Sequence, residues 1–167
     1  LYLLNPGIST QKAIELTKSM GSLFILDEMV TGFKVDFPGA ITKYNLTPDM
    51  TTWGKGIANG FSFCALTGIK EVMQLGGIKD SEKEKVFLIS TTHGGETHSI
   101  RAGIKTIEIF KKRNVIRHNH FIGDKIIQFT TEAIKNEGLE DYIKVIPCNW
   151  VVGYIFYDKN GNISLKH

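Results

Sequence analysis

An aspartate and a lysine stand 28 positions apart, each where an apolar stretch ends. Asp27 follows the run Leu23–Leu26, and Lys55 stands between Gly54 and Gly56. Flanking glycines leave the amine unshielded and let a ligand approach the backbone. A lysine amine forms a Schiff base with a carbonyl carbon, and a carboxylate can pair with a protonated ring nitrogen. Asp27 and Lys55 therefore predict a site that holds two ends of one ligand.

A third candidate lies in the hydroxyl- and glycine-rich segment Ser90–Glu96, which contains Thr92. A helix is predicted directly after it, and free N–H groups at a helix start bind anions such as phosphate. One ligand for all three positions needs an aldehyde for the lysine, a protonated nitrogen for the aspartate and a phosphate for the helix start. Pyridoxal phosphate carries all three groups.

The elements that must position these residues are predicted from the apolar pattern. The continuous run Leu23–Leu26 is typical of a strand buried on both faces of a parallel sheet. Ligands of open α/β sheets bind outside the carboxyl ends of such strands, where Asp27 stands. Because side chains alternate along a strand, Met29 shares the side of Asp27, and Glu28 faces the other way. Asp27 and Met29 are therefore expected to line the same crevice.

A short helix is predicted before this strand, with Ser9 or Thr10 as its N-cap and Gly21 at its end. Ala13, Leu16, Thr17 and Met20 recur in it at helical spacing. A helical turn is expected in Ala40–Asn45 and a short helix in Glu71–Gln74. Further strands are predicted at Met50–Trp53, Phe63–Gly68 and Val86–Ile89, joined by glycine-rich loops with a strong turn at Asn59–Gly60.

Two long helices follow, with apolar faces predicted at Ile100, Ile104, Ile107 and Phe110, and at Ile122, Ile126, Phe129 and Ala133. Strands are then predicted at Ile143–Ile146 and Val151–Tyr157. Asp158–Gly161 is a hairpin-turn pattern, with Ile163 and Leu165 alternating in a return strand. This tail is typical of the beginning of a smaller α+β domain.

Composition narrows the class of protein. With 42% hydrophobic and 22% charged residues among 167, the chain is globular. Its net charge of +3 is mild, and its densest basic run, Lys111–Arg113, closes a helix, so we expect no nucleic-acid partner. Two cysteines, Cys64 and Cys148, suit a reducing compartment, which predicts a cytoplasmic protein. No segment has the length of a membrane span, and no Cys/His spacing matches a metal site.

Three segments, in this order, resemble motifs of the class III pyridoxal-phosphate aminotransferases: Leu23–Lys34, Thr47–Gly60 and Ser90–Glu96. The resemblance covers about Ser9 to Gly138, and the most similar subgroup is that of glutamate-1-semialdehyde aminomutase-like enzymes. It implies an α/β fold, the fold-type-I large domain with a mainly parallel sheet flanked by helices, in residues 1–138. Residues 139–167 would begin the small α+β C-terminal domain, with the chain truncated at both ends.

The resemblance also implies roles for single residues. Lys55 would form the Schiff base with pyridoxal 5'-phosphate and move the proton during amino-group transfer. Asp27 would pair with the ring nitrogen, Met29 would pack on the ring face, and Thr92 would bind the phosphate from the partner subunit of a homodimer with shared active sites. The substrates would be a small-molecule amino donor and a keto or aldehyde acceptor, in a transaminase or an aminomutase, with no metal and no membrane.

The sequence departs from the family pattern in two respects. Gly95-Glu96-Thr97 stands where the family often has Gly-Asn-Pro, which weakens any assignment of substrate. The family's own-subunit phosphate loop, its ring-stacking aromatic residue and its substrate-carboxylate region have no counterpart in these 167 residues. We therefore expect this chain alone to be inactive.

Two alternative readings stay open at this point. Leu23–Glu28 also fits a Walker-B-like strand, in which Asp27 and Glu28 would hold magnesium in an ATPase. That reading requires a Gly-x-x-x-x-Gly-Lys-Ser/Thr loop, which the sequence around Lys55 does not match. The other alternative is a non-catalytic remnant of the aminotransferase fold. Retention of Asp27, Lys55 and Thr92 disfavours it.

Overall fold

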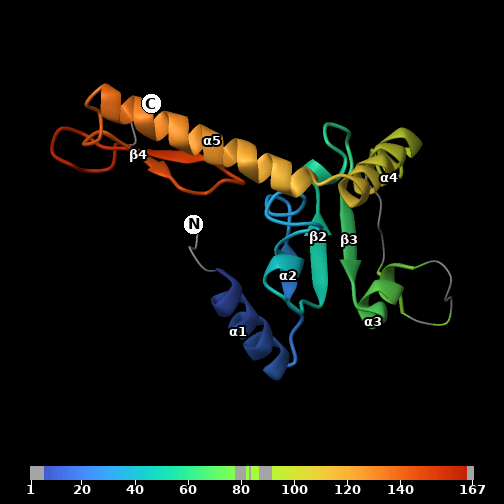
Figure 1. Ribbon diagram of the computed structural model, residues 1–167. Coiled ribbons are helices and arrows are strands. Elements are labelled where there is room, and N and C mark those ends of the chain that lie inside the picture. The colour runs from blue at the N-terminus through green and yellow to red at the C-terminus, as the bar shows by residue number, and fades with distance from the viewer. Residues whose placement is uncertain (1–5, 78–81, 83, 87–91, 165–167) are drawn as a thin grey trace. The chain divides into compact units, whose positions relative to one another are not determined.

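The computed structural model describes residues 6–77, 82, 84–86 and 92–164 (Figure 1). The chain divides into two compact units, one ending at Arg113 and the other beginning at Asn114. The boundary expected after residue 138 concerns the domains of a whole enzyme and stays a prediction.

The sheet of the first unit contains β1 (Ile25–Asp27), β2 (Met50–Trp53) and β3 (Ala65–Gly68), in the order β1-β2-β3. β1 pairs with β2 in parallel, and β2 pairs with β3 antiparallel, so the described sheet is mixed. Figure 1 shows β2 and β3 side by side. Because β1 and β2 run the same way, their carboxyl ends meet at one edge of the sheet.

β1 is shorter and more exposed than the apolar run predicts. Ile25 is 55% exposed, and Leu23, which precedes the strand, is 51% exposed. Within the described residues β1 has one strand neighbour, β2, and its outer edge is uncovered. The prediction of a strand buried on both faces is therefore wrong for this chain, since burial needs neighbours that the described residues do not supply.

α1 (Pro6–Ser19) begins before the predicted N-cap. Proline suits the first turn of a helix because its fixed φ is helical and an N–H there has no partner in the helix. Ser9 and Thr10 consequently lie inside the helix rather than at its cap. Gly21 adopts the predicted left-handed conformation, with φ of +70°, where the helix ends.

The remaining elements of the first unit are short, except for the last helix. They are α2 (Ala40–Lys43), η1 (Lys55–Ile57), α3 (Lys70–Met73), η2 (Gln74–Gly76) and α4 (Thr97–Lys112). The predicted turn at Asn59–Gly60 is confirmed by φ values of +46° and +107°. Of the predicted strand Val86–Ile89, Val86 lies in no element, and residues 87–89 lie outside the described residues.

The core of the first unit is built from the irregular segment after β1 and from the segment around Lys55. Phe33, Trp53, Ile57 and Ala58 form a buried cluster. The Phe33 ring makes edge contacts with Trp53 at 6.3 Å and with Phe110 of α4 at 5.2 Å between centroids. The glycine- and proline-rich stretch that the sequence marks as a loop therefore contributes a central core residue.

The second unit contains α5 (Val115–Asn136), β4 (Ile143–Ile146) and β5 (Gly153–Phe156). β4 and β5 pair antiparallel, and α5 contacts β4. The predicted turn is confirmed, because Gly161 has φ of +78° and its N–H donates to the Asp158 carbonyl at 3.0 Å. Ile163 pairs with Tyr157 as a single bridge, and Leu165 lies outside the described residues.

The predicted apolar faces of α1 and α5 are rotated from the buried ones, whereas the predicted face of α4 is confirmed in part. Ile107 and Phe110 of α4 pack against the core cluster, while Ile104 is exposed. The buried residues of α1, α4 and α5 are Ile14, Ser99, Gly103, Gly123 and Ile134. The predicted positions include residues that are more than 40% exposed, namely Leu16, Met20, Ile104, Ile122, Ile126 and Phe129. At Gly103 and Gly123 the lack of a side chain lets a neighbouring ring or backbone come close.

Candidate active site

Asp27 and Lys55 lie at the same edge of the sheet. In the parallel β1–β2 pair, Asp27 is in register with Thr52, and Lys55 follows Thr52 by three residues. The strand geometry thus places both residues at neighbouring carboxyl ends, as the apolar runs predict. No hydrogen bond or ion pair between the described residues joins Asp27 to Lys55, which leaves both side chains available for a ligand.

The carboxylate of Asp27 is held by one of its two oxygens. Oδ1 accepts the Met29 N–H at 2.8 Å and the Thr52 hydroxyl at 3.1 Å. Oδ2 has no hydrogen-bond partner among the described residues. An exposed carboxylate oriented through one oxygen presents the other as an acceptor. Thr52 was not predicted as a site residue, because only the strand register brings it opposite Asp27.

Lys55 has a backbone conformation that is uncommon for a residue with a side chain. Its φ is +46°, in the left-handed region, which costs about 1 kcal/mol or more for a non-glycine residue. The side chain is exposed, whereas Ile57 and Ala58 after it are buried in the core. The core thus anchors the turn that presents Lys55. Strain of this kind clusters at functional sites and supports a role for this lysine.

Met29 lies against the backbone of Gly54, the residue before Lys55. A Cβ placed on Gly54 would collide with the Met29 sulfur and lie 3.9 Å from the Cβ of Cys64. The glycine therefore makes room for a side chain from the end of β1. Sequence reasoning explains Gly54 by exposure of the lysine amine, while the structure shows that it also makes room for Met29.

Glu28 is fully buried, although Asp27 beside it is exposed. Its carboxylate accepts the N–H groups of Ala40 at 3.0 Å and Ile41 at 2.7 Å, and also the hydroxyl of Thr31. The alternation along the strand predicts that Glu28 faces away from Asp27, but it gives no sign of this network. No signal in the sequence marks the partners, which lie 3 to 13 residues further along.

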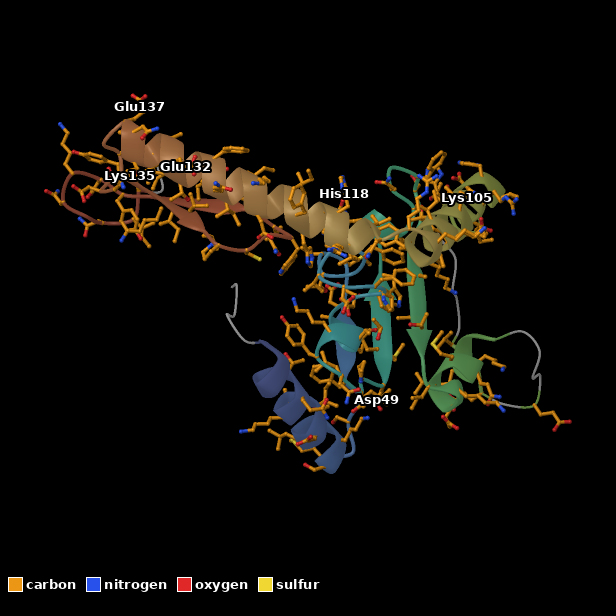
Figure 2. All side chains as sticks on the ribbon, in the orientation of Figure 1. Asp49, Lys105, His118, Glu132, Lys135 and Glu137 are labelled. Carbon is orange, nitrogen blue, oxygen red and sulfur yellow. The ribbon has the colours of Figure 1, made fainter. Side chains whose placement is uncertain are left out.

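Asp49 fixes the beginning of both parallel strands (Figure 2). Only 7% exposed, it accepts the Phe24 N–H through Oδ2 at 2.8 Å, and Lys18 of α1 lies 3.5 Å from Oδ1. Since Phe24 precedes β1 and Asp49 precedes β2, this bond holds the two strands together at the edge opposite Asp27. It therefore supports the register on which the site depends.

Thr92 is exposed in a turn before α4, and Ser90 and Thr91 lie outside the described residues. No hydrogen bond of the described residues joins Thr92 to Asp27 or Lys55, and Thr92 does not belong to the β1–β2 pair that brings those two residues together.

The start of α4 carries a carboxylate held between two histidines. Glu96 lies 2.8 Å from the Nδ1 of His93 and 3.3 Å from the Nε2 of His98. The hydrogen bond with His93 is the largest cause of a pKa of Glu96 below its ordinary value. About two turns further along, a Cβ on Gly103 would lie 3.1 Å from the Phe63 ring and 3.7 Å from the Ile57 carbonyl. α4 therefore packs closely on the segment that follows Lys55.

Among the described residues, no cluster of three or more potential metal ligands occurs. No helix in the described part of the chain has both the length and the apolar character needed to cross a bilayer.

The family model described as Aminotransferase class-III matches residues 6–148. The chain belongs to the class-III aminotransferase family. It is 32% identical over 145 residues to a glutamate-1-semialdehyde 2,1-aminomutase of Neisseria meningitidis serogroup C, a match that covers 84% of this chain and 32% of that protein. The chain thus spans about a third of the length of the curated relatives it matches.

Solved structures confirm the fold. An omega-transaminase from Sphaerobacter thermophilus has a TM-score of 0.69 at 22% identity, over 84% of this chain and 31% of that one. The FumI protein of Sphingopyxis sp. MTA144, described in a PLP internal aldimine form, has a TM-score of 0.70 at 20% identity, over 87% of this chain and 33% of that one. The predicted α/β fold of the fold-type-I aminotransferase large domain is therefore confirmed.

Proposed function

We propose that the protein containing this chain transfers an amino group with pyridoxal 5'-phosphate as its cofactor. The observation that carries the proposal is the Asp27 carboxylate, which is oriented through Oδ1 and open at Oδ2, at the same sheet edge as Lys55. Family membership supports the cofactor. Nothing in the comparisons supports the magnesium-binding ATPase reading of Asp27 and Glu28, which the missing phosphate loop already disfavours.

The residues present fit this cofactor. Lys55 offers an exposed amine to its aldehyde carbon, and Asp27 offers a free carboxylate oxygen to its ring N–H. Bound pyridoxal phosphate supplies an electron sink for a carbanion at the substrate Cα. Asp27 Oδ2 would hold the proton on the ring nitrogen, and Met29 would contact the ring. The Lys55 amine would take and return the proton at the substrate carbon.

Thr92 is assigned to the cofactor phosphate, from the partner subunit of a homodimer. Its exposure and its position before the start of α4 support this role, because helix N-termini favour anions. Each active site would then need two subunits, and substitution of Thr92 by valine is expected to weaken cofactor binding without changing the assembly state.

The substrates are proposed as a primary-amine donor and a keto or aldehyde acceptor. The named relatives include both an aminomutase and a transaminase. An experiment is therefore needed to decide which of the two reactions the protein catalyses. A transaminase turns over only when a separate keto acid is supplied, whereas an aminomutase needs none. We further propose that residues 1–138 belong to the cofactor-binding domain and 139–167 to the small domain, and that the protein is cytoplasmic.

The complete gene product tests the function directly. Purified with pyridoxal phosphate, it should show the visible absorbance of lysine-bound cofactor, and Lys55→Ala should abolish that absorbance. Lys70→Ala is the matched control, since Lys70 is an exposed lysine at the start of α3 in the same unit. Absence of the absorbance in the unmodified protein, or its persistence in Lys55→Ala, would contradict the proposal and favour a non-catalytic remnant.

A further inference from the structure

We infer that Glu28 is a positioning residue, which sets the orientation of Asp27 and Met29 toward the cofactor without touching it. The inference rests on the proposed function, because it concerns the same site. Glu28 stands between the two residues in the chain, and it is 0% exposed.

The Glu28 carboxylate is the shared acceptor of three donors. Oε2 accepts the Ala40 N–H at 3.0 Å and the Thr31 hydroxyl, and Oε1 accepts the Ile41 N–H at 2.7 Å. Both backbone donors belong to the start of α2, whose first N–H groups have no partner within the helix. Glu28 therefore fastens the end of β1 to α2.

The space around this carboxylate is closed. A Cβ on Gly39 would lie 2.5 Å from Oε2 and 2.7 Å from Oε1 of Glu28, so no larger residue at 39 fits without displacing the carboxylate. The chain approaches the carboxylate at Gly39 and then donates to it from the next two residues. The Glu28 carboxylate is therefore confined to a single position.

The backbone of Glu28 transmits that position to both neighbours. Its N–H donates to the Thr52 carbonyl at 3.0 Å, and its carbonyl accepts the Gly32 N–H at 2.9 Å. Thr52 is also the residue whose hydroxyl holds Asp27 Oδ1. Two bonds therefore converge on Thr52, one from the Glu28 backbone and one from the Asp27 side chain. Movement of Glu28 would tilt Asp27 on one side and withdraw Met29 from Gly54 on the other.

A carboxylate is required here, and its amide isostere does not replace it. Two of the three donors are backbone N–H groups, one at each oxygen, and they cannot reverse their direction. A glutamine would direct its NH₂ group at one of them, because only one side of an amide accepts. Glu28→Gln therefore breaks at least one hydrogen bond and sets two donors against each other.

The test uses Glu28→Gln, with Glu71→Gln as the matched control, because Glu71 is exposed on α3. Thr31→Val removes a single donor and serves if Glu28→Gln does not fold, and Thr31→Ser restores the hydroxyl. Cofactor affinity, measured by titrating the apo protein with pyridoxal phosphate, should fall about tenfold or more in Glu28→Gln and severalfold in Thr31→Val, since a hydrogen bond to a charged group is lost.

Amide hydrogen exchange of the apo protein over residues 25–33 separates the two proposals, because it needs no cofactor. Exchange at Met29, whose N–H is bound by Asp27, should accelerate in Glu28→Gln and Thr31→Val and return to the original rate in Thr31→Ser. Unchanged exchange or unchanged affinity in these variants would overturn the positioning role. If the unmodified protein binds no cofactor, the proposed function fails, and the positioning role toward that cofactor is overturned with it.

Discussion

The Thr52 hydroxyl donates a 3.1 Å hydrogen bond to Oδ1 of Asp27, across the register pair that these two residues form in the parallel strands β1 and β2. This bond leaves Oδ2 as the open acceptor at the carboxyl edge of the sheet. The site is therefore a property of the strand pair rather than of Asp27 alone.

Thr52→Val is expected to weaken the binding of pyridoxal phosphate to the complete gene product. Loss of one hydrogen bond to Asp27 corresponds to about 1 kcal/mol, or about a fivefold rise in Kd. The measurement is a spectroscopic titration of the apo protein. Thr52→Ser keeps the donor and should bind as the unmodified protein does, so a fivefold loss in both variants would count against the hydrogen bond as the cause.

Gly54→Ala is expected to displace Met29 and reduce cofactor occupancy. The added Cβ would collide with the Met29 sulfur, and overpacking of this kind costs about 1–3 kcal/mol. Gly77→Ala is the control, because its Cβ would meet the Gln74 carbonyl at an ordinary 3.5 Å. In a Met29→Ala background, which lacks the sulfur, Gly54→Ala should cost little further occupancy beyond that of Met29→Ala alone. An equal loss in both backgrounds would show that Gly54 acts otherwise than through Met29.

Gly123→Ala is expected to destabilise the second unit. Alanine normally favours a helix over glycine by about 1 kcal/mol, but here its Cβ would collide with the backbone of Asn149. The net expectation is a loss of about 1–2 kcal/mol, seen as a lower urea midpoint. Asn119→Ala, at an exposed position of α5, should raise the midpoint slightly. A higher urea midpoint in both Gly123→Ala and Asn119→Ala would contradict the packing of α5 on Asn149.

Asp158 is expected to titrate below its ordinary pKa. Its carboxylate accepts the N–H groups of Asn162 at 2.9 Å and Asn160 at 2.8 Å, and these bonds lower its pKa from 3.8. Because the folded pKa is the lower one, the hairpin gains this stability above pH 3.8 and loses it as the pH falls through the folded pKa. Carboxyl NMR should place the midpoint below 3.8 when folded. The titration midpoint of Asp158 should also be measured in the urea-unfolded protein. A folded midpoint at or above the unfolded one would refute the turn geometry.

Local signals in the sequence predicted several turns and two strands correctly. Gly21, the Asn59–Gly60 pair and Gly161 adopt the left-handed conformations that their residue types favour. The apolar runs before Asp27 and Lys55 predict strands, and both strands are present. Such features depend on residues that are neighbours in the chain, so their pattern is visible without a structure.

What could not be predicted depends on contacts between distant segments. The Thr52–Asp27 bond requires the strand register, and the Glu28 network requires the return of the chain at Gly39. The buried face of α5 was predicted wrongly, because the apolar pattern favours Phe129, while Gly123 marks the packed side by its lack of a side chain. The periodic spacing of apolar residues along a helix does not reveal where the backbone of another segment packs against that helix.

We propose that Lys55 holds the cofactor that Asp27 faces. The most direct measurement is reduction of the purified, complete gene product with borohydride in the presence of pyridoxal phosphate, followed by peptide mapping by mass spectrometry. We predict a single pyridoxyl modification on Lys55. Modification of a different lysine, or none at all, would contradict the claim.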